Sequence, residues 1–236
     1  QFFWQRGPST EELYRFAFVY GQGKCTKFFE EKYDISVSEF QLICFTLMSV
    51  FLKKPITEIP NTSLINVSRE KVEKAFDIVS TPIVNARKLA VQLNVEAAQR
   101  LQGPLRVSYM PSILRRKPII QLDMSRPSYI SPLPNLIMTR ATAGLYYDIR
   151  QGPKELLTEA NHRFEEYIRL LVNGYIPKFK AFKGAAYGQK GRLVDPPDCL
   201  VKSEDRVVVA IECKTTKLTF EAQFSDNPQI VAARGF

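Results

Sequence analysis

One segment near the end of this 236-residue chain places an acid and a base directly after an apolar run. The run is Val207–Ile211, and Glu212, Cys213 and Lys214 follow it. An apolar run of this length predicts a buried β-strand. Side chains two apart on a strand share a face, so Glu212 and Lys214 should project together. A carboxylate beside an ammonium at the end of a core strand is unfavourable for packing alone, so we expect a partner, such as a metal ion with a phosphate.

A second acid upstream can join this pair. Asp198 follows Pro197, and the polar segment 203–206 predicts a hairpin connection. That connection would set Asp198 beside Glu212, although the two are 14 residues apart in sequence. The elements expected after residue 150 are an amphipathic helix over 154–173, strands over 176–182, 193–202 and 207–214, and a helix from near Thr219.

The element order and these motifs resemble the PD-(D/E)XK nuclease superfamily over about residues 155–225. The family core is a helix, three strands, a helix and a further strand, with Pro-Asp near the second strand and Glu-x-Lys on the third. Pro197-Asp198 and Glu212-Cys213-Lys214 match these motifs, and Glu165 matches an acid that is common on the first helix. The resemblance implies a mixed α/β fold, in which a mainly helical N-terminal half precedes a restriction-endonuclease-like αβββα core.

The resemblance also implies an endonuclease that depends on Mg²⁺ or Mn²⁺. Asp198, Glu212 and the backbone carbonyl of Cys213 would hold the metal. Lys214 would orient the attacking water, and Glu165 would support a second metal or the water network. Phosphodiester hydrolysis needs a hard cation to offset charge and to lower the pKa of water, and Mg²⁺ prefers oxygen ligands and few protein carboxylates. Lys214 would also stabilise the charge that builds in the transition state.

Alternatives remain at each of these positions. Asp195 competes with Asp198, although three residues along a regular strand it would face the other side. Glu166 competes in the same way with Glu165. The simplest alternative for the Glu-x-Lys motif is an exposed strand end that carries a solvated ion pair. The family often has a polar residue on the helix after the third strand, for which Gln223 is a loose match.

The sequence gives little support for a catalytic site based on histidine, a phosphate loop or zinc. His162 is the only histidine, which excludes sites that need two, and a lone histidine near a helix start is more often a surface residue. Segment 21–26 resembles a phosphate loop, but it lacks the first glycine and has Cys25 where Ser or Thr would bind magnesium. The four cysteines form no CxxC pair, so we expect reduced thiols in a cytoplasmic protein and no zinc site.

The charge balance favours a polyanionic partner. The net charge is +9, and the first 150 residues hold 20 Lys and Arg against 13 Asp and Glu. Segment 174–194 has no acid, and aromatic residues lie among its bases, which could contact a nucleic-acid backbone. The alternative is an ordinary strand with lysines on its solvent face. The bases are Lys178, Lys180, Lys183, Lys190 and Arg192.

The N-terminal half, 1–150, is expected to be a mainly helical module of unknown role. Capping signals at Ser9, Ser36 and Ser68 predict helices over 13–20, 36–53 and 69–79, and Thr81-Pro82 starts a fourth that runs to about 101. Short apolar runs predict strands over 105–110 and 119–122. The most apolar stretch, 42–52, is shorter than the roughly 20 residues that span a bilayer, so no membrane is expected.

Three functions follow as hypotheses. The first is a metal-dependent nuclease, with DNA favoured over RNA and with a homo-oligomer or a regulatory protein as partner. The chain looks like prokaryotic proteins that pair a helical half with this core, several of which serve in defence against foreign DNA. The second is a non-cleaving nucleic-acid-binding or assembly subunit with the same fold. The third is a DNA-reading helix within 36–101, with 68–79 as the candidate. The chain begins at Gln1 and ends before a fourth strand, so we expect a fragment whose domain 151–236 is truncated at its C-terminus.

Overall fold

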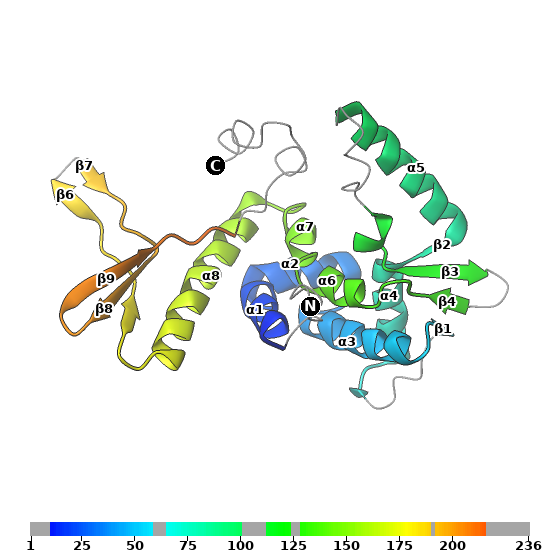
Figure 1. Ribbon diagram of the computed structural model, residues 1–236, viewed down its shortest axis with the longest axis horizontal. Coiled ribbons are helices and arrows are strands. Elements are labelled where there is room, and N and C mark those ends of the chain that lie inside the picture. Colours follow the sequence, from blue (N-terminus) through cyan, green and yellow to red (C-terminus); the bar gives the residue numbers. More distant parts are fainter. Residues whose placement is uncertain (1–9, 59–64, 101–111, 124–127, 190–191, 216–236) are drawn as a thin grey trace, which may run out of the picture.

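The computed structural model describes residues 10–58, 65–100, 112–123, 128–189 and 192–215. It is a mixed α+β fold: a helical body with a four-stranded sheet, followed by one long helix, α8, that leads to a second, three-stranded sheet (Figure 1). The helices are α1 Thr10–Tyr20, α2 Gly23–Tyr33, α3 Val37–Lys53, α4 Arg69–Val79, α5 Ile83–Arg100, α6 Asn135–Ala141, α7 Leu145–Ile149 and α8 Lys154–Tyr175, with a 3₁₀ turn at Ile113–Arg115. The strands are β1 Ile56–Thr57, β2 Ser80–Pro82, β3 Ile119–Asp123, β4 Ser128–Ile130, β5 Lys180–Phe182, β6 Tyr187–Gln189, β7 Arg192–Val194, β8 Cys199–Ser203 and β9 Arg206–Ile211.

The capping signals predicted two helices with the correct bounds. Helix α3 begins after Ser36, whose hydroxyl accepts a hydrogen bond from the Glu39 backbone N–H, while the Glu39 carboxylate accepts one from the Ser36 N–H. Helix α4 begins after Ser68, whose hydroxyl accepts from the Lys71 N–H. In both cases the side chain satisfies a backbone donor that the first helical turn leaves unpaired.

The first sheet was only partly predicted. Its order is β1-β4-β3-β2, and β2 pairs with β3 in parallel while the other pairs are antiparallel. Strand β3 matches the expected strand, but the other three have only two or three residues each. Strands this short show no alternation that a sequence pattern could reveal, because their pairing depends on the tertiary fold. Helix α2 was also missed, and no capping side chain marks its start.

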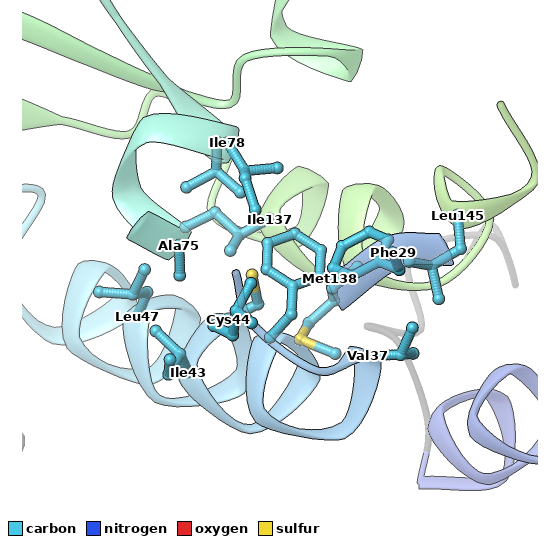
Figure 2. Close-up of a cluster of buried hydrophobic side chains, with 14 of the residues drawn as sticks. Phe29, Val37, Ile43, Cys44, Leu47, Ala75, Ile78, Ile137, Met138 and Leu145 are labelled. Atoms are coloured by element: carbon cyan, nitrogen blue, oxygen red, sulfur yellow. The ribbon is translucent and has the colours of Figure 1, made fainter. Parts of the chain in front are cut away.

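One core joins the helices of the N-terminal half. Figure 2 shows Phe29 of α2, Leu47 of α3, Ala75 of α4 and Ile137 of α6 in one cluster of buried side chains. All four are fully buried, and so is Leu145 of α7. Since truncating a large side chain at such a position typically costs about 2–5 kcal/mol, these contacts account for much of the stability of this half.

A charged group is also buried beside this core. Arg140 donates two hydrogen bonds to Asp148, from Nη1 to Oδ2 at 2.6 Å and from Nη2 to Oδ1 at 3.0 Å. The Tyr33 hydroxyl donates to Asp148 Oδ1 at 2.8 Å. Burial and the charge of Asp148 raise the pKa of Tyr33 above its ordinary value, so the phenol keeps its proton and remains a donor. The network ties α2 to α6 and α7.

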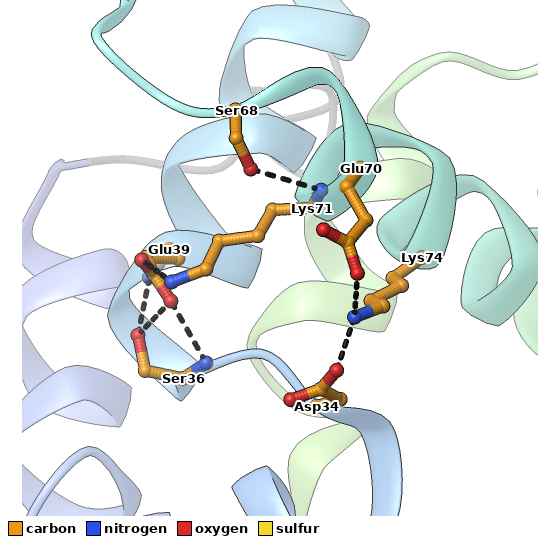
Figure 3. A network of polar contacts seen from close by, with 7 residues as sticks. All are labelled: Asp34, Ser36, Glu39, Ser68, Glu70, Lys71 and Lys74. Atoms are coloured by element: carbon orange, nitrogen blue, oxygen red, sulfur yellow. Dashed lines mark hydrogen bonds and ion pairs between the residues drawn. The ribbon is translucent and has the colours of Figure 1, made fainter.

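In helix α4, the candidate DNA-reading helix, both lysines form ion pairs with acids of the same chain. Lys71 pairs with Glu39, and Lys74 bridges Asp34 and Glu70 (Figure 3). Bonding to Lys74 lowers the pKa of Asp34. Burial acts to raise the pKa of Glu39, but Lys71 and Ser36 outweigh it, so that pKa is also lowered. These pairs fasten α4 to the start of α3, which favours a structural role for the helix.

The second sheet has the antiparallel order β5-β8-β9. The strand expected over 193–202 is wrong as a single element: it divides into β7 and β8, and β7 pairs with β6 in a separate hairpin. Pro196 and Pro197 lie between the two strands, and proline has no N–H to donate to a ladder. The chain therefore leaves the hairpin and enters β8 directly after Asp198.

Strand β9 corrects the expectation of a buried core strand. Val207, Val208 and Val209 are 54%, 51% and 48% exposed. Strand β9 is the edge strand of the described sheet, and Ile168 and Val172 of α8 pack over the cluster of Ala181, Cys199 and Val201. An apolar run does not distinguish an edge strand from a central one, because β-branched residues are common in both kinds of strand.

Five expectations lie outside the described residues: the strand over 105–110, the helix from near Thr219, Gln223, the cap at Ser9, and Lys190. Among the helices that the structure describes, none has both the length and the apolar composition to cross a membrane by itself. Helices α2 and α3 together have that length and composition, but the chain bends by 66° between them.

Replacing Ser36 by alanine should lower the free energy of unfolding by about 1 kcal/mol, because the Glu39 backbone N–H loses its acceptor and the Glu39 carboxylate loses the Ser36 hydroxyl as a donor. Urea denaturation followed by circular dichroism measures this. Ser49→Ala is the matched control, since Ser49 lies inside α3 and its hydroxyl only donates back to the Phe45 carbonyl. Equal losses in the two variants would contradict the capping role.

Asp148→Leu should cost about 3–5 kcal/mol, because it leaves the Arg140 guanidinium buried without a counter-charge. The double variant Arg140→Met with Asp148→Leu should recover most of that loss. The Tyr33 hydroxyl loses its acceptor in both variants, so this effect cancels in the comparison. Chemical denaturation of the two variants is the measurement, and a double variant no more stable than the single one would refute the account.

Candidate functional site

Helix α8 belongs to both halves of the molecule. Its first turns bury Leu156 and Ala160 in the N-terminal core, while Ile168 and Val172 pack against the second sheet. A helix of 22 residues can serve two cores because its opposite ends lie about 30 Å apart. The acid at Glu165 lies between the two contact regions.

The start of α8 is fixed on the loop between α1 and α2. Glu159 accepts a hydrogen bond from the Lys24 backbone N–H at 3.1 Å and pairs with Arg163, and Arg163 Nη1 donates to the Gln22 carbonyl at 2.6 Å. Gly23 has φ +54°, and a Cβ there would collide with both side chains. A carboxylate of the protein itself thus occupies the N-terminus of α2, which agrees with the rejection of segment 21–26 as a phosphate loop.

Three polar residues of α8 recur every four positions and face the second sheet. Asn161 accepts a hydrogen bond from the Thr215 hydroxyl. Arg169 Nη1 donates to the Asp198 carbonyl at 3.0 Å and lies 3.9 Å from Glu165 Oε2. Residues at i, i+4 and i+8 share one helix face, so α8 presents a polar stripe to the ends of β8 and β9.

Asp198 meets the Glu-x-Lys segment as expected. The register pairs Cys199 of β8 with Ile211 of β9, so the residues flanking that pair are Asp198 and Glu212. Asp198 Oδ2 accepts a hydrogen bond from the Cys213 backbone N–H at 2.7 Å. The rival, Asp195, is exposed and lies before the two prolines.

Glu212 and Lys214 project together as expected, although strand β9 ends at Ile211 and not at residue 214, so both residues follow the strand. Lys214 Nζ lies 2.6 Å from Glu212 Oε1, and the two side chains are 57% and 59% exposed. Bonding to Glu212 and the nearby charges, Asp198 among them, raise the pKa of Lys214, so it stays an ammonium. The geometry is also the one that the simplest alternative predicts, a solvated ion pair at a strand end.

Cys213 lies close to the acids of the site. Burial raises the pKa of its thiol to about 11, and the charges of Asp198 and Glu165 act in the same direction. The side chain therefore remains a neutral thiol, and only its backbone carbonyl is suited to a hard cation. Glu165 is half-buried on this side of α8, whereas Glu166 and His162 are exposed.

The donor chemistry suits Mg²⁺, but the described side chains do not converge on one point. Asp198, Glu212 and the Cys213 carbonyl are oxygen donors, and Mg²⁺ needs only one or two carboxylates. Within the described residues, however, no group of three or more His, Cys, Asp or Glu side chains is placed to hold a metal. The Glu212 carboxylate is bonded to Lys214 in this geometry.

Arg169 is the site residue that the sequence reasoning missed. Its spacing of four from Glu165 on one helix was the available signal, since residues at i and i+4 are neighbours on a helix surface. Of the predicted nucleic-acid-binding residues, Lys178, Lys180 and Lys183 are exposed on and beside β5. Lys190 lies outside the described residues, and Arg192 begins β7.

Comparison with protein-family models, with curated proteins and with solved structures gave no match to this chain. The case for a function therefore depends on the geometry above and on the motifs.

Replacing Asp198 by alanine should remove the acceptor of the Cys213 N–H and speed exchange of that amide with solvent by roughly tenfold or more. Hydrogen exchange followed by NMR measures it. Asp198→Asn keeps an oxygen acceptor and should have a smaller effect, and Asp195→Ala should have none. An unchanged Cys213 amide in Asp198→Ala would contradict the proposed contact.

Proposed function

We propose that the protein is a metal-dependent nuclease that hydrolyses phosphodiester bonds of nucleic acid, with DNA favoured over RNA. The observation that supports this most directly is the 2.7 Å hydrogen bond from the Cys213 N–H to Asp198. It joins the acid of the Pro-Asp motif to the backbone of the Glu-x-Lys motif, 15 residues further on. The PD-(D/E)XK resemblance relates these same two motifs to one active site.

Each proposed residue has a role that its environment permits. Asp198, Glu212 and the Cys213 carbonyl would hold Mg²⁺ or Mn²⁺, which supplies charge neutralisation and a more acidic water. Lys214, kept protonated by its neighbours, would orient the attacking water and stabilise negative charge on the phosphoryl oxygens. Glu165 would accept hydrogen bonds from water in the site, because its carboxylate lies 3.9 Å from Arg169, which in turn donates to the Asp198 carbonyl.

The biological setting is part of the same proposal. By resemblance, the nuclease would act in the cytoplasm of a prokaryote, in defence against foreign DNA. A second copy of the chain or a regulatory protein would control it, with the helical half 1–150 as the contact region. The net charge of +9 agrees with a polyanionic substrate.

A second candidate function is binding of nucleic acid without cleavage. The exposed ion pair between Glu212 and Lys214 favours it, because a carboxylate neutralised by lysine is less available to a cation. The two candidates differ in what Asp198→Asn does. A nuclease should lose cleavage, whereas a binding protein should keep its affinity or bind more tightly once a negative charge is removed.

Plasmid, linear duplex, single-stranded DNA and RNA should be incubated with the protein and Mg²⁺ or Mn²⁺, with EDTA as the metal control. We expect cleavage that Asp198→Asn, Lys214→Ala and Glu165→Gln each reduce by about 100-fold or more, because each removes a charge at the reacting phosphate or its water. The neighbours give matched controls: Asp195→Asn and Glu166→Gln should stay close to wild type. Cleavage that survives Lys214→Ala or EDTA would sink the assignment.

A further inference from the structure

A hollow of about 520 Å³ lies between the end of α8 and the first two strands of the second sheet. Lysines and aromatic rings form much of its wall, and within the described chain it contains no acidic side chain. Asp198 directly precedes strand β8, and Lys202 lies four residues further along the chain, so the hollow lies about 13 Å along the strand from the proposed catalytic acids. The lining residues are Asn173, Pro177, Phe179, Lys180, Ala181, Phe182 and Lys202.

Two lysines of the hollow face each other across the sheet. Lys180 of β5 and Lys202 of β8 are direct partners in the antiparallel register. Like charges directly opposite on neighbouring strands destabilise a sheet. Neither lysine forms an ion pair within the described part of the chain, whereas Lys71 and Lys74 in the N-terminal half are both paired. An anion bound between Lys180 and Lys202 would relieve this repulsion.

One aromatic ring of the hollow is left accessible. Phe182 lines the hollow and is 37% exposed. Phe179, in contrast, packs against the cluster under the sheet. Unpaired bases stack on an accessible ring, while the bases of a duplex already stack on one another and are not available. Two lysines beside an accessible ring therefore fit a single strand better than a duplex.

Hydrogen bonds tie one wall of the hollow, strand β5, to the end of α8. The Asn173 side chain donates to the Ala181 carbonyl at 3.1 Å and accepts from the Ala181 N–H at 2.8 Å. This amide takes the place of a neighbouring strand at the outer edge of β5 and ties that strand to the end of α8. Lys180 and Phe182, on either side of Ala181, are thus held on a rigid element.

We propose that this hollow binds single-stranded nucleic acid, with a backbone phosphate between Lys180 and Lys202 and a base stacked on Phe182. The proposal deepens the nuclease function and rests on it for the identity of the ligand. It adds Lys202, Phe182 and the strandedness of the substrate to what the motifs imply. The bound strand would lead along β8 toward Asp198.

The test is fluorescence anisotropy with a short labelled single-stranded DNA, in EDTA so that no cleavage occurs. Lys180→Gln with Lys202→Gln should weaken binding by roughly tenfold and lower the slope of log affinity against log salt by about 0.7 for each phosphate that is no longer neutralised. The matched control is Lys53→Gln with Lys54→Gln, which removes the same charge from exposed lysines of the N-terminal half. Phe182→Leu should weaken binding by about 5- to 100-fold with little change in that slope.

Thermal unfolding separates loss of binding from loss of fold. The Lys180/Lys202 variant should melt at or above the wild-type temperature, because its two strands no longer place like charges opposite each other. Binding would then fall while stability holds or rises, which damage to the sheet cannot produce.

Two results would overturn the proposal. One is a Lys180/Lys202 variant that binds as tightly as the Lys53/Lys54 control. The other is duplex DNA that binds as tightly as the single strand while Phe182→Leu leaves affinity unchanged. Cleavage plays no part in these measurements, so the two proposals can fail separately. A protein that cleaves no nucleic acid would refute the nuclease function and leave the binding proposal open. A protein that cleaves, but whose Lys180/Lys202 variant keeps its affinity, would refute the binding proposal and leave the nuclease function standing.

Discussion

The arrangement of the molecule depends on a single helix, α8, that packs against two separate hydrophobic clusters. Helix α8 gives Leu156 and Ala160 to the N-terminal core and Ile168 and Val172 to the second sheet. That sheet buries only three hydrophobic side chains among the described residues, which is too few to stabilise a sheet alone. Its strands therefore depend on α8, and α8 depends on the Glu159 and Arg163 contacts that fix it to the helical half.

Sequence patterns succeeded where a local signal decides the structure. Capping residues at Ser36 and Ser68 gave α3 and α4, and the Ser203–Arg206 connection gave the turn that brings Asp198 to Cys213. Patterns failed where the tertiary fold decides. The short strands of the first sheet exist because neighbouring strands pair with them, and the valine pattern of β9 does not indicate that the strand lies at an edge.

The candidate site was predicted in its members more than in its geometry. Asp198, Glu212 and Lys214 were expected from motif spacing, and the backbone register brings their segments together. The partner of each side chain could not be predicted from the sequence. Glu212 can bond either to Lys214 or to a cation, and motif spacing does not distinguish these two arrangements. Arg169 went unnoticed since an arginine on a polar helix face is ordinarily solvated, and only the fold shows that it reaches the Asp198 carbonyl.

The exposed valines of β9 have a consequence for handling the protein. Within the described residues, the outer side of this strand has no partner, and an apolar edge of this kind is a template for pairing with another chain. Arg206 at one end of the strand and Glu212 and Lys214 at the other are the charges that interrupt it. Charged residues that flank an apolar strand act as gatekeepers against aggregation. Lys214 thus limits the length of the apolar edge whether or not it takes part in catalysis.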